Sequence, residues 1–218
     1  MTARLAPEIR LDVLEVLKST ADVPFEAHGF KRTPKGFFYS RKTNLAEHKI
    51  LIHADCHPKM ARDKEVQFKP YMCLQMDVVS RMALDLAKGD KFLLAGFPEI
   101  IINQPVDFVA PKDSFTRWFA TGKTQMAECV QQICDFAKCW VIPFFDQLTS
   151  PEELIKIYAD NNTRVIRPHH WYVYIAAAYL VKGKPQNAME VLEAKLGSIG
   201  LKKDFAVIFN SVREKMKK

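Results

Sequence analysis

The sequence has no long apolar run. A membrane-spanning helix needs roughly 20 consecutive apolar residues, and the strongest candidate is the short tract around Trp171 to Val181. The first residues lead into a stretch with Asp12, Glu15 and Lys18, so they lack the uncharged apolar core of a signal peptide. We therefore expect no membrane span, and the sequence predicts a cytoplasmic protein.

Cysteine is scarce and odd in number. A disulfide framework uses paired cysteines in an oxidising compartment, so we expect free thiols in a reduced one. Three of the cysteines are spaced by five residues, and each such step turns by about 140° on a helix, so these three cannot share one metal ion. The five are Cys56, Cys73, Cys129, Cys134 and Cys139.

Motifs that identify a reaction are missing. The tract Gly197 to Gly200 has the wrong spacing for the Gly-x-Ser-x-Gly elbow of hydrolases. Gly122 begins a Gly-Lys-Thr tripeptide, but a phosphate-binding loop needs another glycine five positions earlier, where Arg117 stands. The tripeptide therefore predicts a helix start, and we expect neither an enzyme nor a bound cofactor.

Charge is unevenly distributed along the chain. The 32 basic and 25 acidic residues give a net charge of +7 and a pI near 9.1. Residues 1–60 carry +3, residues 61–163 carry −3 and residues 164–218 carry +7. The chain therefore has a basic end beside a mildly acidic middle, and the total alone does not identify a nucleic-acid-binding protein.

Hydrophobic periodicity indicates an α+β fold. We expect an N-terminal helix, a small antiparallel β-sheet, and a helical C-terminal half that ends in a helical hairpin and a final helix. Without a long linker, residues 1–218 are expected to form a single domain, with a helix in 1–20, the sheet region in 30–110 and the helical region in 123–218. The strands are predicted at 36–41, 48–54, 70–80, 92–97 and 99–103.

The helical half has clear boundaries. A helix is expected at 124–140. The next helix is expected to begin at Ser150, which is a capping serine. Pro151 follows it at the first helical position, and Glu153 stands three residues after the cap. Residues 168–180 and 185–196 predict a packed hairpin, and the last helix starts near Asp204. The hairpin has the side chains of one tetratricopeptide unit, but a second copy is absent and stacking arrays need about three.

Two clusters could serve a metal or a nuclease. His53, Asp55 and His57 would share one face of an extended strand, yet Pro58 ends that strand and a fourth ligand is not evident. Residues 47–49 have the Glu-x-Lys spacing of metal-dependent nucleases without a convincing acidic residue nearby. The favoured interpretation of the first cluster is that its residues are solvated turn residues. The favoured interpretation of the second is a chance match of three residues. We therefore expect no metal.

A basic aromatic hairpin offers another alternative. Lys31, Arg32 and Arg41 alternate with Phe37, Phe38 and Tyr39, a combination that can bind single-stranded nucleic acid by charge and stacking. Core aromatics with solvated cations are the favoured interpretation.

The same tracts, Gly29-Phe30-Lys31-Arg32 and residues 36–41, resemble a bacterial family of small α+β domains of unassigned biochemical function. Residues 117–119, and 140–145 leading into the helix at Ser150, are also similar. The resemblance spans residues 10–160, with 164–218 as an added hairpin and tail. No catalytic residue anchors it.

Such domains occur beside toxin genes, so the resemblance implies an immunity protein of an interbacterial toxin system served by type VI secretion. It would bind a cognate toxin, for example a nuclease, and neutralise it without catalysis. Because nuclease clefts are often cationic, carboxylates and aromatic anchors of the acidic middle are the expected partner contacts. These are Asp63, Glu65, Asp107, Asp113 and Trp118. A nucleic-acid-binding module and a metal-dependent enzyme are the alternatives.

Overall fold

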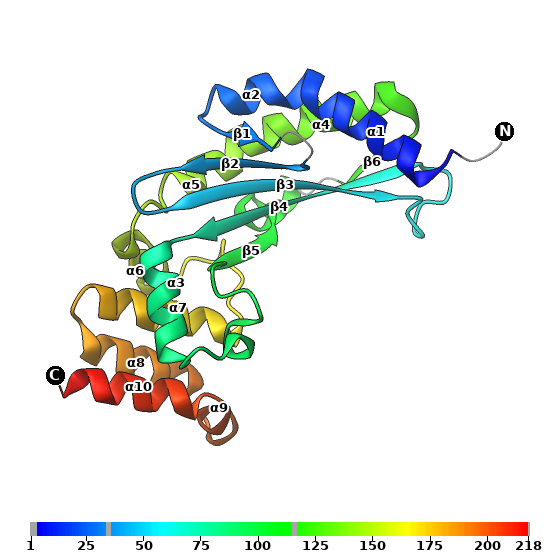
Figure 1. Ribbon diagram of the computed structural model, residues 1–218. Helices are drawn as coiled ribbons and strands as arrows, with labels where there is room; N and C mark the ends of the chain where they lie inside the picture. The colour runs from blue at the N-terminus through cyan, green and yellow to red at the C-terminus, as the bar shows by residue number, and fades with distance from the viewer. Residues whose placement is uncertain (1–3, 34–35, 115–116, 218) are drawn as a thin grey trace. The chain divides into compact units, whose positions relative to one another are not determined.

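The computed structural model describes residues 4–33, 36–114 and 117–217, and Figure 1 labels its helices and strands. The chain forms two compact units. Unit 1 comprises residues 1–41, 48–73 and 104–146, and unit 2 comprises residues 42–47, 74–103 and 147–218. The expected class is confirmed: an N-terminal helix, an antiparallel sheet and a helical C-terminal half. The single domain expected from the sequence stays a prediction.

The sheet has the order β1-β2-β3-β4-β5, and β6 also pairs with β4. Arg32 is opposite Tyr39 where β1 meets β2, and Phe68 is opposite Trp118 where β4 meets β6. Along β4, buried and half-buried residues alternate without interruption because successive side chains point to opposite faces. The strands are β1 Lys31–Arg32, β2 Phe38–Lys42, β3 Glu47–Cys56, β4 Val66–Gln75, β5 Ile102–Pro105 and β6 Trp118–Ala120.

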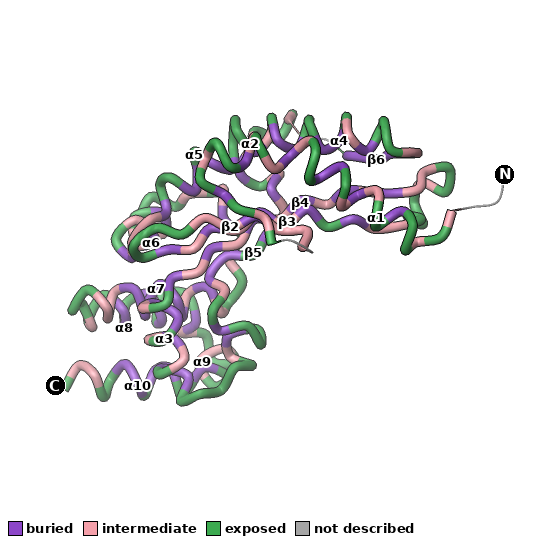
Figure 2. Tube along the Cα trace, turned by 45° about the horizontal axis from the view of Figure 1, so that its top comes forward, coloured by how far each residue is buried: buried purple, intermediate pink, exposed green. Residues whose placement is uncertain are grey.

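Helices α1 and α4 contact each other in unit 1 and lie on the same side of its strands (Figure 1). Each has a buried stripe along one side and exposed residues along the other (Figure 2). Glu8 helps to fix the start of α1, since its carboxylate accepts a hydrogen bond from the Leu5 amide at 3.0 Å. The helices of this unit are α1 Ala6–Val16, α2 Asp22–Glu26, α4 Gly122–Phe136 and α5 Ile142–Phe145.

Both long helices of unit 1 contain one π-helical turn. Leu17–Ala21 joins α1 to α2, and Ala137–Val141 joins α4 to α5. In each turn the amide that follows donates to the carbonyl five residues back. Pro24 and Pro143 come shortly afterwards, and a proline ring clashes with the carbonyl four residues before it and cannot bond to it. The prolines therefore account for the local widening of both helices.

Unit 2 is built around α7. Seven of its residues are buried, and it contacts α3, α6 and α8, as expected for a helix that is apolar on all sides. Helix α10 packs on α8 and α3. The helices are α3 Asp77–Leu86, α6 Pro151–Ala159, α7 His169–Val181, α8 Pro185–Leu196, α9 Ile199–Asp204 and α10 Ala206–Met216.

The helical half agrees with the sequence prediction. The Ser150 hydroxyl accepts a hydrogen bond from the Glu153 amide, and the predicted hairpin is formed by α7 and α8. The helix expected at 124–140 is longer than predicted. It runs from Gly122 to Phe145 and consists of α4, the π-helical turn and α5. The final helix is divided at Phe205 into α9 and α10.

Three predicted strands are wrong in part or in full. Residues 77–80 belong to helix α3, because Val79, Ala83 and Leu86 recur at helical spacing and are buried. Residues 92–97 contain the 3-10 turn Lys91–Leu94, and the left-handed backbone at Ala95 and Gly96 prevents an extended strand. The strand expected at 99–103 begins later, at Ile102.

Candidate functional site

Residues 106–117 leave the sheet between β5 and β6. Both flanking strands pair with β4. Its described part contains two 3-10 turns, Val106–Val109 and Lys112–Ser114. It carries Asp107 and Asp113, and it ends next to Trp118, so three of the five predicted partner contacts belong to one region of unit 1.

Unit 1 has a hollow of about 300 Å³ between residues 67–71 of β4 and the two ends of this segment, which we call the unit 1 pocket. Its wall is largely apolar and aromatic, and one carboxylate faces it beside two cationic side chains. Such a mixture suits a partner side chain with an apolar body and a charged end. The lining residues are Met60, Gln67, Phe68, Lys69, Pro70, Tyr71, Pro105, Val106, Asp107, Arg117 and Trp118.

Asp107 is the carboxylate of this pocket. It is half-buried, and no side-chain hydrogen bond or ion pair to another described residue engages it. Phe108 beside it is 44% exposed, and Met60 on the pocket rim is 83% exposed. Sequence reasoning missed Phe108 and Met60, although the phenylalanine directly after Asp107 was a usable signal.

Trp118 is a wall of the unit 1 pocket rather than a protruding anchor. Its side chain is 5% exposed and packs edge-to-face on Phe136, with ring centroids 5.7 Å apart. Its indole Nε1 is buried and has no hydrogen-bond partner among the described residues. Trp118 can therefore meet a partner only through the pocket that it lines.

Asp113 lies in the second 3-10 turn of the segment and is exposed. No side-chain hydrogen bond or ion pair to another described residue engages it. It therefore remains available to a cationic partner, outside the pocket lining.

Glu65 has a structural role. Its Oε2 accepts a hydrogen bond from the Gly122 amide at 2.8 Å and from Arg4 at 3.3 Å. A carboxylate at the start of α4 satisfies a free amide donor and interacts favourably with the helix dipole. The Gly-Lys-Thr tripeptide is thus a helix start, as expected, and its first amide is occupied by this chain's own carboxylate.

Asp63, the fifth predicted contact, is 73% exposed. Its carboxylate pairs with Lys64 at 2.9 Å, and the hydrogen bond from Lys64 lowers the pKa of Asp63. Asp63 is therefore a surface carboxylate in a weak exposed ion pair.

The histidine cluster is occupied by internal contacts. The Asp55 carboxylate accepts a hydrogen bond from Lys69 at 2.9 Å, which lowers the pKa of Asp55. His57 has its Nε2 2.9 Å from the Arg4 carbonyl. Across residues 4–33, 36–114 and 117–217, no three His, Cys, Asp or Glu side chains are grouped as metal ligands would be. The geometry gives no support to a metal site with His53.

In the basic aromatic hairpin, Arg32 and Tyr39 make contacts within unit 1, whereas Lys31 is exposed and Phe37 and Phe38 are half-buried. Arg32 donates two hydrogen bonds to Asp22, at 2.7 and 3.0 Å, and is 9% exposed. Tyr39 is fully buried and donates to Asp22 at 2.9 Å. Burial, and then the Asp22 carboxylate, raise the pKa of Tyr39. For Asp22, burial alone would raise the pKa, but the hydrogen bonds from Arg32 and Tyr39 lower it below its ordinary value.

Arg41 and His48 complete this core. Arg41 donates to Asp146 at 2.7 Å, and its guanidinium carbon lies 4.8 Å from the centre of the Phe30 ring. Arg41 also lies 3.2 Å from His48 Nδ1, and because a guanidinium only donates, that nitrogen accepts. His48 is fully buried and stacks on Phe145 at 4.6 Å. In the tripeptide 47–49, the histidine is thus a core residue.

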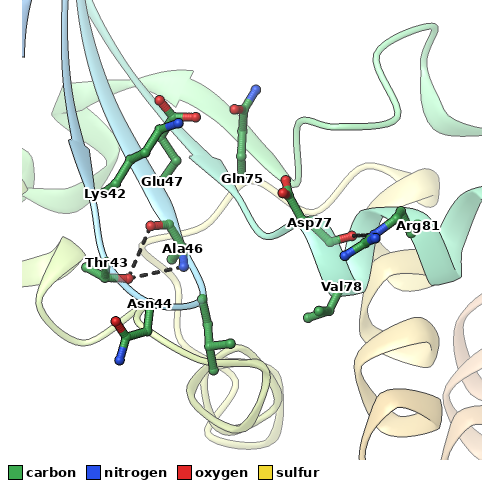
Figure 3. Close-up of a pocket in the computed structure, with 10 residues that line it drawn as sticks. Lys42, Thr43, Asn44, Ala46, Glu47, Gln75, Asp77, Val78 and Arg81 are labelled. Carbon is green, nitrogen blue, oxygen red and sulfur yellow. Dashed lines mark hydrogen bonds between the residues drawn. The ribbon is translucent and has the colours of Figure 1, made fainter.

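Unit 2 has a more polar hollow, of about 260 Å³, between the turn 43–46 and the start of α3 (Figure 3). Lys42 and Arg81 contribute positive charge, and Glu47 and Asp77 contribute carboxylates. The Thr43 hydroxyl is used within the turn, where it donates to the Ala46 carbonyl and accepts from the Ala46 amide, both at 3.1 Å. This hollow can attract ions of either sign, and its hydroxyl is not presented as a nucleophile.

All five cysteines are free thiols and all belong to unit 1. Burial raises the pKa of Cys73 to about 11 and that of Cys134 to about 12. Cys139 is exposed. The thiols of the half-buried Cys73 and the buried Cys134 are therefore unreactive near neutral pH.

Comparisons of the chain with protein-family models, with curated proteins and with solved structures find no match. Among the described residues, no helix combines the length and the apolar character that crossing a membrane requires. The family resemblance therefore stays a prediction, and a candidate binding site has to be argued from the geometry of unit 1.

Proposed function

We propose that this chain is a non-catalytic binding protein that neutralises a cognate bacterial toxin, and that it holds the toxin at the unit 1 pocket. The observation that carries the proposal is the unit 1 pocket itself, where a carboxylate without a partner among the described side chains adjoins exposed apolar side chains. Interface hot spots combine these two elements, an apolar anchor and a charge that pairs on binding. The family resemblance supplies the toxin as the partner class.

The contacts of the other candidate residues favour this function over chemistry. Glu65 caps a helix, Asp55 pairs with Lys69, and His48 is stacked in the core. Arg32 and Tyr39 are bound to Asp22. Asp107, in contrast, combines partial exposure with a carboxylate that no described side chain engages.

The toxin would contribute a cation to this site. A lysine or arginine from a nuclease cleft could place its aliphatic stem against Tyr71 and Trp118 and its charged end against Asp107. Blocking such a cation would remove a group that the toxin needs for its own phosphate substrate. In the producing cell this neutralisation would take place in the cytoplasm.

The test is co-expression with the toxin encoded beside this gene, together with a binding measurement on the purified pair. We expect the wild-type chain to restore growth and Asp107→Arg to bind about 10- to 100-fold more weakly, the range of a charge reversed within a hot spot. Asp204→Arg makes the same charge change at an exposed position of unit 2 and should bind as the wild type does. Failure of the wild-type chain to restore growth would overturn the function, and equal weakening by both variants would overturn the site.

A further inference from the structure

The helices of unit 1 pack on one face of its strands. Tyr39 of β2 lies 4.5 Å from Phe25 of α2, and His48 of β3 lies 4.6 Å from Phe145 of α5, measured between ring centroids. Helices α1 and α4, which continue into α2 and α5, lie on the same side of the strands (Figure 1). Because successive side chains of a strand point to opposite faces, the neighbours of Tyr39 and His48 belong to the other face.

This other face, which we call the second face, is the less buried one. In β3 and β4 it consists of the odd-numbered residues of 49–55 and 67–73. All of these residues are half-buried or exposed, whereas the even-numbered residues between them are buried. The alternation shows that the second face is in contact with solvent along both long strands.

The outer strands add three side chains to the second face. Phe38 and Ser40 flank the residue of β2 that packs on α2, so both point to the second face. Lys31 of β1 lies opposite Ser40, and Phe119 of β6 lies opposite Gln67. Residues directly opposite each other on antiparallel strands share a face. The second face therefore includes Lys31, Phe38 and Phe119.

The charge of the second face is positive. It carries Lys31, Lys49 and Lys69 against the single carboxylate of Asp55, a net charge of +2, and His53 is exposed among them. Asp55 pairs with Lys69 at 2.9 Å, with side chains that are 44% and 40% exposed. An ion pair this exposed contributes little, so Lys69 can exchange the carboxylate for a phosphate. The face is thus complementary to a polyanion.

Aromatic rings are interleaved with these lysines. Phe38, Tyr71 and Phe119 come from β2, β4 and β6, and each is half-buried, so each offers part of its side chain to solvent. Aromatic side chains on a sheet stack on the bases of single-stranded nucleic acid, and every base has a π-face. A duplex keeps its bases stacked inside, and an acidic peptide needs the lysines alone. The combination therefore favours a single strand over both.

We propose that the second face of unit 1 binds single-stranded nucleic acid, with its lysines on the phosphates and its aromatic rings on the bases. Lys69 and Tyr71 also line the unit 1 pocket, whereas Phe38 and Lys49 do not. Variants at Phe38 and Lys49 therefore test this activity separately from the proposed toxin binding.

Fluorescence anisotropy of a labelled oligonucleotide of about 12 nucleotides, titrated with the full chain over a salt series, tests the proposal. We expect the logarithm of the affinity to fall with the logarithm of salt concentration with a slope of about −2, since three lysines each contribute about −0.7 on a single strand. DNA and RNA of the same sequence identify which backbone is preferred. The absence of binding by either up to roughly 0.1 mM would overturn the proposal.

Two variants and a matched control locate the binding. Phe38→Leu keeps an apolar side chain but removes a stacking ring, so it should weaken binding about tenfold. Lys49→Gln should reduce the salt slope by about 0.7. Lys138→Gln removes the same charge from an exposed position in the π-helical turn between α4 and α5 and should change neither quantity.

Three results would contradict the second face as the site. Equal losses in Lys49→Gln and Lys138→Gln would mean that the net charge of the chain attracts the strand without a defined site. Unchanged affinity in Phe38→Leu would remove the stacking. Displacement of the oligonucleotide by a polyglutamate peptide as readily as by unlabelled oligonucleotide would make an acidic protein the partner. Far-UV circular dichroism confirms that all three variants are folded.

Discussion

The contacts inside unit 1 differ in kind from the contacts inside unit 2. In unit 1, partly buried charges connect segments far apart in sequence: Arg32 binds Asp22, and Arg41 binds Asp146. In unit 2, Lys88–Glu214, Lys182–Glu152, Lys202–Glu193 and Lys215–Asp85 are ion pairs whose side chains are 30% to 63% exposed, so they contribute little. Unit 2 therefore depends mainly on the apolar packing around α7, whereas unit 1 also depends on specific polar partners.

The net charges of the two units differ less than the net charges of the segments along the sequence. Unit 1 contains 16 basic and 13 acidic residues and unit 2 contains 16 and 12, so their net charges are +3 and +4. The acidic middle of the sequence is divided between the two units, and the contrast of −3 and +7 along the chain disappears. A partner would therefore respond to local groups such as Asp107 rather than to a charge difference between the two units.

The largest effect is expected in the core of unit 2. Trp171 is 1% exposed and lies in the central helix, so Trp171→Ala should lower the free energy of unfolding by about 3–5 kcal/mol through lost burial and a cavity. Guanidinium unfolding followed by circular dichroism measures this. Trp140→Ala, at a tryptophan that is 38% exposed, should cost much less, and equal losses would contradict the assignment of the core.

Thiol labelling addresses unit 1 alone, because unit 2 has no cysteine in the sequence. At pH 8, Cys139 should react more than about 100-fold faster than Cys134, whose pKa is raised to about 12. Mass spectrometry of the labelled chain identifies the order in which the cysteines react. In a chain whose Trp118 and Trp140 are replaced by phenylalanine, Trp171 is the remaining tryptophan and reports on unit 2. If Cys134 became reactive at the same denaturant concentration at which this fluorescence changes, the chain would unfold as the single domain that the sequence predicts.

Acid should weaken unit 1 through Asp22. Its pKa is lowered in the folded state, so its contribution is present above its unfolded pKa, near 4, and is lost as pH falls through the lower folded value. Asp22→Asn should cost about 1–3 kcal/mol at pH 7 and should flatten the pH dependence below pH 4. Asp113→Asn is the control, and an unchanged acid profile in Asp22→Asn would show that this network does not stabilise unit 1.

Glu65→Gln should have the smallest effect, about 1–2 kcal/mol, because the charge at the start of α4 is lost. Asp63→Asn changes a neighbouring exposed carboxylate and should leave the thermal midpoint unchanged. Binding of the toxin should be unaffected by Glu65→Gln once the chain is folded. If Glu65→Gln weakened toxin binding without lowering the stability of the chain, Glu65 would be a partner contact, as the sequence predicts.

The sequence was a good guide where a signal was local. The cap at Ser150 and the strand expected at 48–54 depend on neighbours along the chain, and the expected elements formed there. The strand expected at 92–97 failed because Asp90 and the left-handed residues after Leu94 made a tight turn from apolar residues. Glu65 could not be assigned in advance, because its partner Gly122 is 57 residues away.

The π-helical turns of unit 1 have a consequence for insertions and deletions. Leu17–Ala21 and Ala137–Val141 lie 120 residues apart, and at the same offset Lys18 matches Lys138 and Phe25 matches Phe145. A one-residue deletion within either turn would rotate everything after it by about 100° around the helix axis. The phenylalanine that follows the shortened turn, Phe25 or Phe145, is almost fully buried and would then leave the core. The spacing of these two helices is thus more constrained than the identity of most of their residues.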